Sequence, residues 1–431
     1  AETSTRDWSA VDVPHTWQVS PASAEYQGAA WYRRTFHAPA DWAGKAVRIE
    51  FEAVNHSATV WLNGTLLGRH LRSGYTVFTL DASLALKPGT LNTLAVKADN
   101  AFDDAMLPRG KSSDWTVDGG IIRPVHLLVT PPVYIERVEV ESEVDLSSRA
   151  ARIAVRALVR NTLPDAAEIK IGYRIIEDDT GNTVLEQRAA ARPSLKAGAA
   201  ELISLPPATL SNPRLWHFDH PHLYRVMVEI AGDRQPPHSY SDTFGIRKLE
   251  VKQAGFYLNG ERVRLMGVER MAGSHPEYGM AEPSSWIEHD HKDLKELNCV
   301  FTRVHWQQDR RVLDYCDRHG VLIQEEVPAW GTDTFAGMKD EPSPEIVQNG
   351  LEQLREMIAR DRNHPCVFAW GLCNEVDGQN PPAQKFIRRM AEEARKLDPI
   401  RLLTYASNTL QHTPERDVAG ELDFISWNEY F

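Results

Sequence analysis

The sequence predicts two β-sandwiches followed by a domain of alternating strands and helices. Residues 1–132 and 133–242 contain many short strand-like segments, separated by turn residues and without a long helical period. From residue 243 onwards, apolar runs alternate with segments of helical periodicity. The length of 431 residues agrees with this division, since domains average about 150 residues.

The first segment is expected to fold as a β-sandwich. Residues 47–51 and 58–62 have the composition of strands, and Asn63-Gly64 follows the second of them. Asn-Gly next to a strand is a strong hairpin signal because both residues tolerate a positive φ. Short strands joined by tight turns pack face to face as two sheets.

The second segment is expected to fold as an immunoglobulin-like sandwich. Ile153, Val155, Ala157 and Val159 recur at every second position, which is typical of a strand with one buried face. A domain of this kind has about 100 residues. The segment has no cysteine, so the domain is not of the disulfide-bonded kind.

The third segment, from residue 243, alternates predicted strands with predicted helices. A hairpin at 256–262 opens this segment. Ser285 and Glu288 form a capping-box pattern, and Gly320 ends a helix. Strands are expected at 263–268, 299–304, 321–324, 366–371, 402–405 and 424–427, and helices at 284–297, 309–319, 345–361 and 383–397. The alternation predicts either a (β/α) barrel or a doubly wound parallel sheet. No glycine-rich phosphate loop follows the first strand, which argues against nucleotide binding.

The number of strands is smaller than a closed barrel needs. Six strands are predicted here, whereas a TIM barrel has eight and about 250 residues. We therefore expect the sequence to stop before the end of the barrel, with the last two strand–helix units beyond Phe431.

Charge and hydropathy exclude several classes of partner. The net charge of −12 disfavours nucleic acid and anionic membranes. No run approaches the roughly 18 apolar residues of a membrane span. The first residues show no signal peptide, and the sequence leaves the compartment open between cytoplasmic and, if a signal peptide was removed, periplasmic or secreted.

The four cysteines are expected to be inert core thiols. Cys299, Cys316, Cys366 and Cys373 lie in the last third of the chain and lack the spacing of a zinc site. No metal site is therefore predicted.

Candidate chemistry is concentrated in Trp370-Gly371-Leu372-Cys373-Asn374-Glu375. The apolar run before Asn374 predicts a buried parallel strand, and the carboxyl end of such a strand is where barrel enzymes place catalytic groups. A carboxyl group partly removed from water there keeps its proton more readily, as a general acid requires. The alternative is that Glu375 only completes the strand end or caps the next helix.

These residues resemble glycoside hydrolase family 2, which includes β-galactosidases, β-glucuronidases and β-mannosidases. The resemblance implies an N-terminal jelly-roll sugar-binding-like domain at 1–132, an immunoglobulin-like sandwich at 133–242 and an incomplete (β/α)8 TIM-barrel catalytic domain at 243–431. The motifs that carry the resemblance follow the family's order over most of the chain, at 14–17, 31–36, 114–123, 212–216, 221–224, 244–247, 267–270 and 370–375.

The resemblance also implies an activity. The family hydrolyses β-glycosides with retention of configuration, which uses one carboxylate as nucleophile and one as acid and base. Glu375 matches the acid/base, and Asn374 matches the residue that binds the sugar 2-OH. The nucleophile is expected on a seventh strand, beyond Phe431. Glu429 is a less favoured candidate, because it lies in a segment resembling the family's sixth strand.

Five further residues are candidates for sugar binding. Asp114 resembles a jelly-roll aspartate that reaches the barrel mouth, His305 a substrate-binding histidine, and Trp306 stands beside that histidine. Glu326 is expected either to bind a hydroxyl or to pair with an arginine, and Tyr430 either lines the pocket or only packs. An arginine role for Arg303 is in doubt, because many members carry theirs three residues before the histidine rather than two.

One departure concerns specificity. Where many members have Asn-Arg-His or Asn-Lys-His, this chain has Glu269-Arg270-Met271, which suggests a different sugar from that of the best-known members. We expect a retaining exo-β-glycosidase without a cofactor, first a β-galactosidase and second a β-glucuronidase or another β-glycosidase. The third hypothesis is a non-catalytic carbohydrate-binding protein that lacks the nucleophile. Under each hypothesis the partner is a carbohydrate. The resemblance also leaves open that the protein forms a homo-oligomer.

Overall fold

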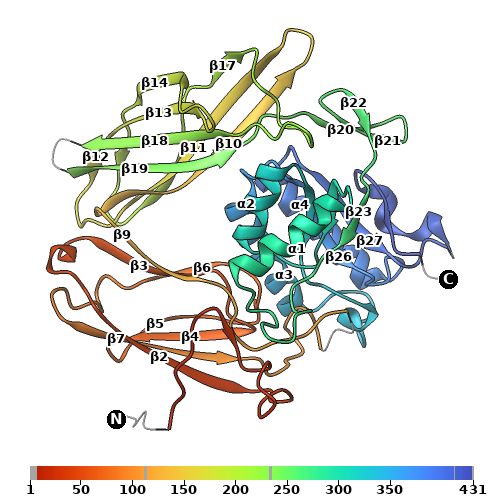
Figure 1. The fold of residues 1–431 in the computed structure, drawn as a ribbon, viewed down its shortest axis with the longest axis horizontal. Helices are drawn as coiled ribbons and strands as arrows, with labels where there is room; N and C mark the ends of the chain where they lie inside the picture. Colours follow the sequence, from red (N-terminus) through yellow and green to blue (C-terminus); the bar gives the residue numbers. More distant parts are fainter. Residues whose placement is uncertain (1–6, 111–113, 233–234, 412, 430–431) are drawn as a thin grey trace.

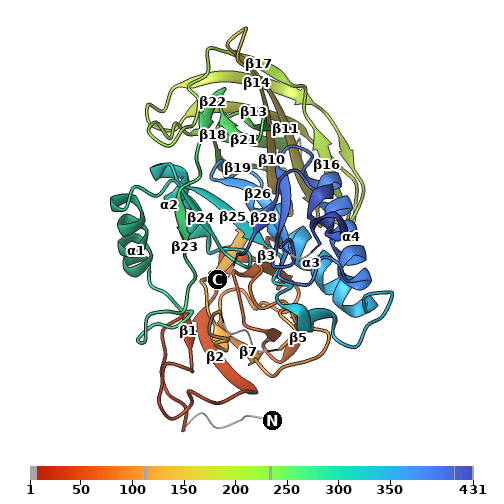
Figure 2. The same cartoon turned by 90° about the vertical axis from the view of Figure 1, so that its right-hand side faces the viewer.

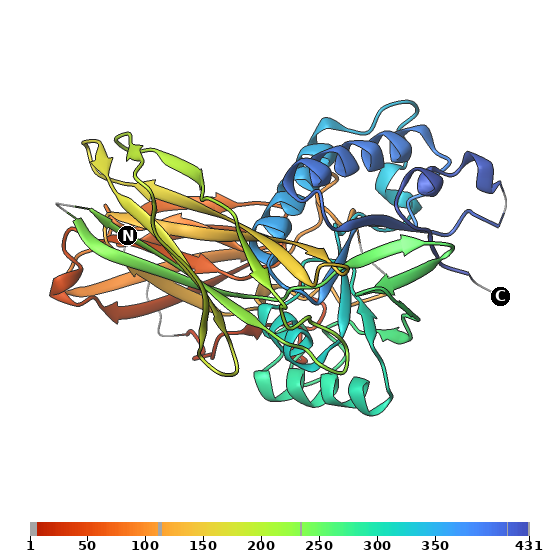
Figure 3. The ribbon, with the colours of Figure 1, turned by 90° about the horizontal axis from the view of Figure 1, so that it is seen from above.

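The computed structural model describes residues 7–110, 114–232, 235–411 and 413–429. It consists of two β-sandwiches and a half-barrel of parallel strands covered by helices (Figure 1). Seen from above, both sandwiches lie on one side and the half-barrel lies on the other (Figure 3). The predicted order of two β-sandwiches and an α/β domain is therefore confirmed. The expected boundaries, 1–132, 133–242 and 243–431, remain a proposal.

The first sandwich packs a four-stranded sheet, β2-β7-β4-β5, against a three-stranded sheet, β6-β3-β9. The predicted hairpin is present: Asn63 and Gly64 have φ values of 52° and 84° between β4 and β5. The strands are β1 (His15–Thr16), β2 (Ala29–His37), β3 (Ala46–Phe51), β4 (Ser57–Leu62), β5 (Thr65–His70), β6 (Phe78–Asp81), β7 (Leu91–Asp99), β8 (Gly120–Ile121) and β9 (Val125–Thr130).

The second sandwich packs the sheet β10-β11-β16, to which β17 adds, against the sheet β14-β13-β18-β19. The alternation predicted from Ile153 to Val159 is observed, since these side chains of β11 are buried every second residue. The strands are β10 (Val133–Asp145), β11 (Ala150–Asn161), β12 (Ala167–Glu168), β13 (Lys170–Glu177), β14 (Thr183–Ala191), β15 (Ser194–Leu195), β16 (Ala200–Ser204), β17 (Ala208–Ser211), β18 (Tyr224–Gly232) and β19 (Gln235–Phe244).

The third part begins with a small antiparallel sheet of β20 (Leu249–Lys252), β21 (Gly255–Leu258) and β22 (Glu261–Val263). Six parallel strands follow, and each pairs with the next one along the chain. This sequential order belongs to a barrel, because a doubly wound sheet reverses its strand order. The strands are β23 (Gly267–Glu269), β24 (Phe301–Arg303), β25 (Leu322–Glu326), β26 (Val367–Asn374), β27 (Leu402–Ser407) and β28 (Ser426–Trp427).

Four helices cover the outside of the parallel sheet: α1 (Ser284–Glu296), α2 (Arg310–His319), α3 (Pro344–Asp361) and α4 (Pro381–Leu397). Gly320 ends α2 with a φ of 67°, as predicted. The predicted capping box of Ser285 and Glu288 is wrong, because Pro283 occupies the N-cap position and no side chain caps α1. None of the helices in the described ranges is long and apolar enough to cross a membrane.

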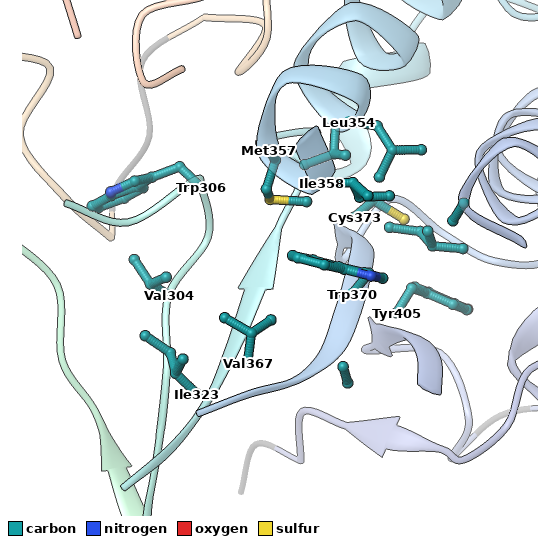
Figure 4. Packing of buried hydrophobic residues seen from close by; sticks show 14 of the residues in the cluster. Val304, Trp306, Ile323, Leu354, Met357, Ile358, Val367, Trp370, Cys373 and Tyr405 are labelled. Carbon is teal, nitrogen blue, oxygen red and sulfur yellow. The ribbon is translucent and has the colours of Figure 1, made fainter. Parts of the chain in front are cut away.

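The core of the half-barrel lies between the parallel sheet and its helices. Trp370 of β26 packs near Met357 and Ile358 of α3 and beside Tyr405 of β27 (Figure 4). All eight residues of β26 are buried, as the apolar run preceding Asn374 predicted. The four cysteines are free and buried, and burial raises the pKa of Cys316, Cys366 and Cys373, so these thiols do not ionise near neutral pH.

The first sandwich is fastened to the half-barrel by buried contacts. Arg123 donates through Nη2 to the carbonyl of Gln307 at 2.7 Å, and through Nη1 to the carbonyls of Tyr75 at 2.8 Å and Gln308 at 3.3 Å. The ring of Tyr75 stacks on Trp306, with ring centroids 4.9 Å apart. These contacts hold the loop that follows β24 against the sandwich.

Glu325 and Glu326 are adjacent on β25 but face opposite sides of the sheet, because side chains alternate along a strand. Glu325 points towards the helices, where its Oε1 accepts a hydrogen bond from the backbone N–H of Gln308 at 2.7 Å. Burial, together with the nearby carboxylate of Asp361, raises the pKa of Glu325 to about 8, although Arg360 opposes this. Glu326 points to the inner side.

Candidate active site

The carboxyl ends of four neighbouring strands bring four polar side chains together. Glu269, Arg303, Glu326 and Asn374 are the last residues of β23, β24, β25 and β26, respectively. Because these strands are parallel and adjacent, their last residues lie side by side at one edge of the sheet. Figure 2 labels β23, β24, β25, β26 and β28 of this sheet.

Arg303 connects these side chains. Its Nε and Nη2 donate to Oε1 and Oε2 of Glu326 at 2.5 and 3.1 Å, a two-pronged contact that fixes the guanidinium plane. Nη2 also donates to Oδ1 of Asn374 at 2.7 Å, and Nη1 lies 3.2 Å from Oε1 of Glu269. Arg303, which stands two residues before His305, thus holds Glu326 and Asn374 in place.

Glu326 is completely buried and its oxygens are engaged. Besides Arg303, it contacts Nδ1 of His305 at 3.1 Å and accepts from Nε2 of Gln324 at 2.7 Å. Burial by itself would raise the pKa of Glu326, but Arg303 and His305 hold that pKa at about 2. Glu326 was expected either to pair with an arginine or to bind a hydroxyl. The structure shows the pairing with Arg303, and the contact with a sugar hydroxyl remains a prediction.

His305 joins the barrel to the loop from the first sandwich. Its Nε2 lies 3.3 Å from Oε1 of Glu269 and 3.9 Å from Oδ2 of Asp114. Trp115 stacks on the His305 ring with centroids 5.3 Å apart, and Trp330 donates from Nε1 to Oδ2 of Asp114 at 2.7 Å. The sandwich loop therefore reaches the mouth of the half-barrel, where the sequence predicts Asp114 to lie.

Asn374 and Glu375 form a pair at the end of β26. The backbone N–H of Glu375 donates to the carbonyl of Ala406 in β27 at 2.9 Å. Nδ2 of Asn428 donates to Oδ1 of Asn374 at 3.0 Å and to Oε1 of Glu375 at 2.8 Å. Glu375 is half-buried and has a φ of 54°, a left-handed conformation that non-glycine residues adopt infrequently.

The remaining predicted residues are placed differently. Trp306 is fully buried between Tyr75 and Trp115, so its ring joins the two domains and its sugar contact remains a prediction. Tyr430 lies outside the described residues. Glu429, the less favoured nucleophile, is exposed just after β28.

Three contributing residues were missed or left without a role. The sequence marks Glu269 only as a departure from the family pattern and predicts no role for Trp330 or Asn428. The signal for Glu269 and Asn428 was their position at or just after a strand end. The signal for Trp330 was a tryptophan soon after the polar end of a buried strand.

A separate cluster has the donor atoms of a metal site. Asp317, His364 and Cys366 bring one ligand atom each within 4.8 Å of one another. Internal contacts account for the carboxylate, since Asp317 bonds Nδ1 of His364 at 2.6 Å and the backbone N–H of Cys366 at 2.9 Å. The cluster lies at the opposite end of β26 from Asn374, and we assign it a structural role.

Comparison with known proteins gives consistent matches along the chain. The family models for the sugar binding domain, the central domain and the TIM barrel domain of glycosyl hydrolases family 2 match residues 5–131, 133–247 and 249–431. A β-glucuronidase of Bacteroides fragilis is 30% identical, with 97% of this chain aligned. A β-galactosidase of Thermoanaerobacter pseudethanolicus is 33% identical, with 90% aligned.

Solved structures are similar as well. A β-glucuronidase of Bacteroides uniformis superposes with a TM-score of 0.87 at 26% identity, covering 100% of this chain and 52% of that protein. The chain spans 60% of the length of the B. fragilis relative and 50% of the T. pseudethanolicus relative.

Proposed function

We propose that this chain, which belongs to glycosyl hydrolases family 2, carries the sugar-binding and proton-donating residues of a retaining β-glycosidase. The observation that supports this most is the Asn374–Glu375 pair, held at the end of β26 by Asn428 and, through Asn374, by Arg303. A carboxyl group fixed in this way at the mouth of a barrel can transfer a proton to and from a bound substrate.

Glu375 is proposed as the general acid and base. In a retaining reaction this group first protonates the leaving-group oxygen and then removes a proton from the attacking water. The hydrogen bond from Asn428 restricts Glu375 to one orientation, so the carboxyl group need not be ordered during the reaction.

Asn374 is proposed to bind a sugar hydroxyl. Its Oδ1 accepts from Arg303 and Asn428, which leaves the amide nitrogen to act as donor. That nitrogen is buried and has no hydrogen-bond partner among the residues that the structure describes. A buried unsatisfied donor costs free energy, which a hydroxyl acceptor from a sugar would recover. Asp114 and His305 are proposed to bind further hydroxyls from the opposite side.

For the sugar itself we favour a β-galactoside and place a β-glucuronide second. Relatives at 33% and 30% identity carry the names β-galactosidase and β-glucuronidase, respectively. A purely carbohydrate-binding role is the third candidate.

A panel of aryl β-glycosides tests this proposal on the natural gene product that carries these residues. Glu375→Gln should reduce kcat/KM by at least 100-fold on substrates with poor leaving groups. It should reduce kcat/KM much less on activated aryl glycosides, since only the former need an acid. Glu296→Gln is the control, because Glu296 lies on the outer helix α1 and pairs with Lys292, and it should leave both rates within a few-fold of wild type. Equal losses on both substrate classes would remove Glu375 from the acid role, and no turnover of any glycoside by the wild type would reject the enzyme.

A further inference from the structure

Glu269 adds a carboxylate to the site at a position where many family members have asparagine. It ends β23, and its Oε1 lies 3.2 Å from Nη1 of Arg303 and 3.3 Å from Nε2 of His305. Its side chain remains 37% exposed, whereas those of Arg303 and His305 are 12% and 2% exposed. Glu269 therefore presents its charge at the surface of the site, above two nearly buried basic groups.

The two basic side chains next to Glu269, Arg303 and His305, also contact Glu326. Arg303 makes a two-pronged contact with the buried carboxylate of Glu326, and His305 contacts the same carboxylate through Nδ1. In the described part of the chain, Arg303 and His305 are the basic side chains that contact Glu269 and Glu326. With Asp114 3.9 Å from His305, carboxylates outnumber the basic groups they surround.

We propose that Glu269 selects the charge of the sugar, so that the site accepts uncharged glycosides and rejects uronides. A carboxylate at the surface of the site accepts hydrogen bonds from sugar hydroxyls. The same carboxylate repels the anionic group of a uronic acid, and this repulsion is strongest at low salt. Uncharged glycosides would then be the substrate class of the proposed glycosidase. Turnover of them rests on the proposed function, whereas charge selection can also be measured as binding.

Binding of galactose and galacturonate, followed by tryptophan fluorescence at pH 7, tests the inference without catalysis. Trp115 and Trp330 lie beside Asp114 and His305 and would report occupancy. The wild-type natural protein should bind galactose at least tenfold more tightly than galacturonate. Glu269→Gln should reduce this ratio at least fivefold, mainly by tighter binding of galacturonate, and Glu269→Asp should preserve the ratio because it keeps the charge. Added salt should reduce discrimination in the wild type but not in Glu269→Gln.

Glu296→Gln is the matched control, because Glu296 lies on the outer helix α1 and pairs with Lys292. A wild type that binds galacturonate as tightly as galactose, or that binds neither, overturns the inference. So does a ratio that Glu269→Gln leaves unchanged. Turnover of glycosides with an unchanged ratio would leave the proposed function intact and reject only the role of Glu269. Charge-selective binding without turnover of any glycoside would support Glu269 and reject the enzyme.

Discussion

Adjacent glutamates on β25 should affect stability in opposite directions as pH changes. Glu326 has a pKa of about 2 in the folded protein, against an ordinary value of 4.5. At about 1.4 kcal/mol for each pKa unit, this corresponds to about 3 kcal/mol of folding free energy. The contribution is present above pH 4.5 and is lost as pH falls from 4.5 towards 2. Glu325, with a pKa of about 8, contributes stability below pH 4.5 that is lost as pH rises towards 8.

Two amide substitutions separate these effects, because glutamine resembles a protonated glutamate. Glu326→Gln should be less stable than wild type by about 3 kcal/mol at pH 7, and the difference should shrink as pH falls to 3. Glu325→Gln should match wild type near pH 4 and exceed its stability at pH 8. Urea unfolding, followed by tryptophan fluorescence at each pH, measures both differences. A Glu326→Gln difference that is constant between pH 3 and pH 7, or the same trend with pH for both variants, would refute the reasoning.

Two further predictions concern the contacts between the first sandwich and the half-barrel. Trp330→Phe removes the donor to Asp114 and should raise KM several-fold without lowering the melting temperature by more than a few degrees. Asp114→Ala should have a similar effect. The double variant should be no worse than the stronger single variant, since both substitutions remove the same hydrogen bond between Trp330 and Asp114. Arg123→Met leaves the carbonyls of Tyr75 and Gln307 without the donor that Arg123 supplies, whereas the carbonyl of Gln308 keeps Arg360 as a donor. The substitution should destabilise the protein by about 2–4 kcal/mol, with calorimetry revealing separate unfolding of the domains. A melting curve identical to that of wild type would argue against domain fastening by Arg123.

Much of the half-barrel could be predicted because buried parallel strands are continuous apolar runs. The strand that precedes Asn374 is one example, and Gly320 marked the end of α2 for an equally local reason. Ser285 misled because its hydroxyl fits a capping pattern, whereas α1 already begins at Ser284 and the N-cap is Pro283, which has no side-chain acceptor.

The contacts within the site were harder to predict, because they join residues that are distant in sequence. Asp114 and Trp330 are separated by 216 positions, and no local pattern connects them. The contacts of Glu269 and Arg303 depend on the pairing of β23, β24 and β25, which sets Glu269 opposite Arg303 and Arg303 opposite Gln324, two residues before Glu326. The sequence located the strands to within a few residues of their ends. Which side chains contact one another at those ends depends on the order of the strands in the sheet.

The loop that carries Asp114 and Trp115 has a consequence for how such a protein diversifies. It comes from a sandwich that contributes none of the parallel strands, yet its side chains contact Trp330 and His305 at the barrel mouth. Replacement of Asp114 can therefore change the rim of the site without touching a strand end, whereas Trp115 also belongs to the core of the half-barrel and is less free to vary. Grafting the loop between relatives, rather than altering strand ends, offers a direct way to exchange their preferences.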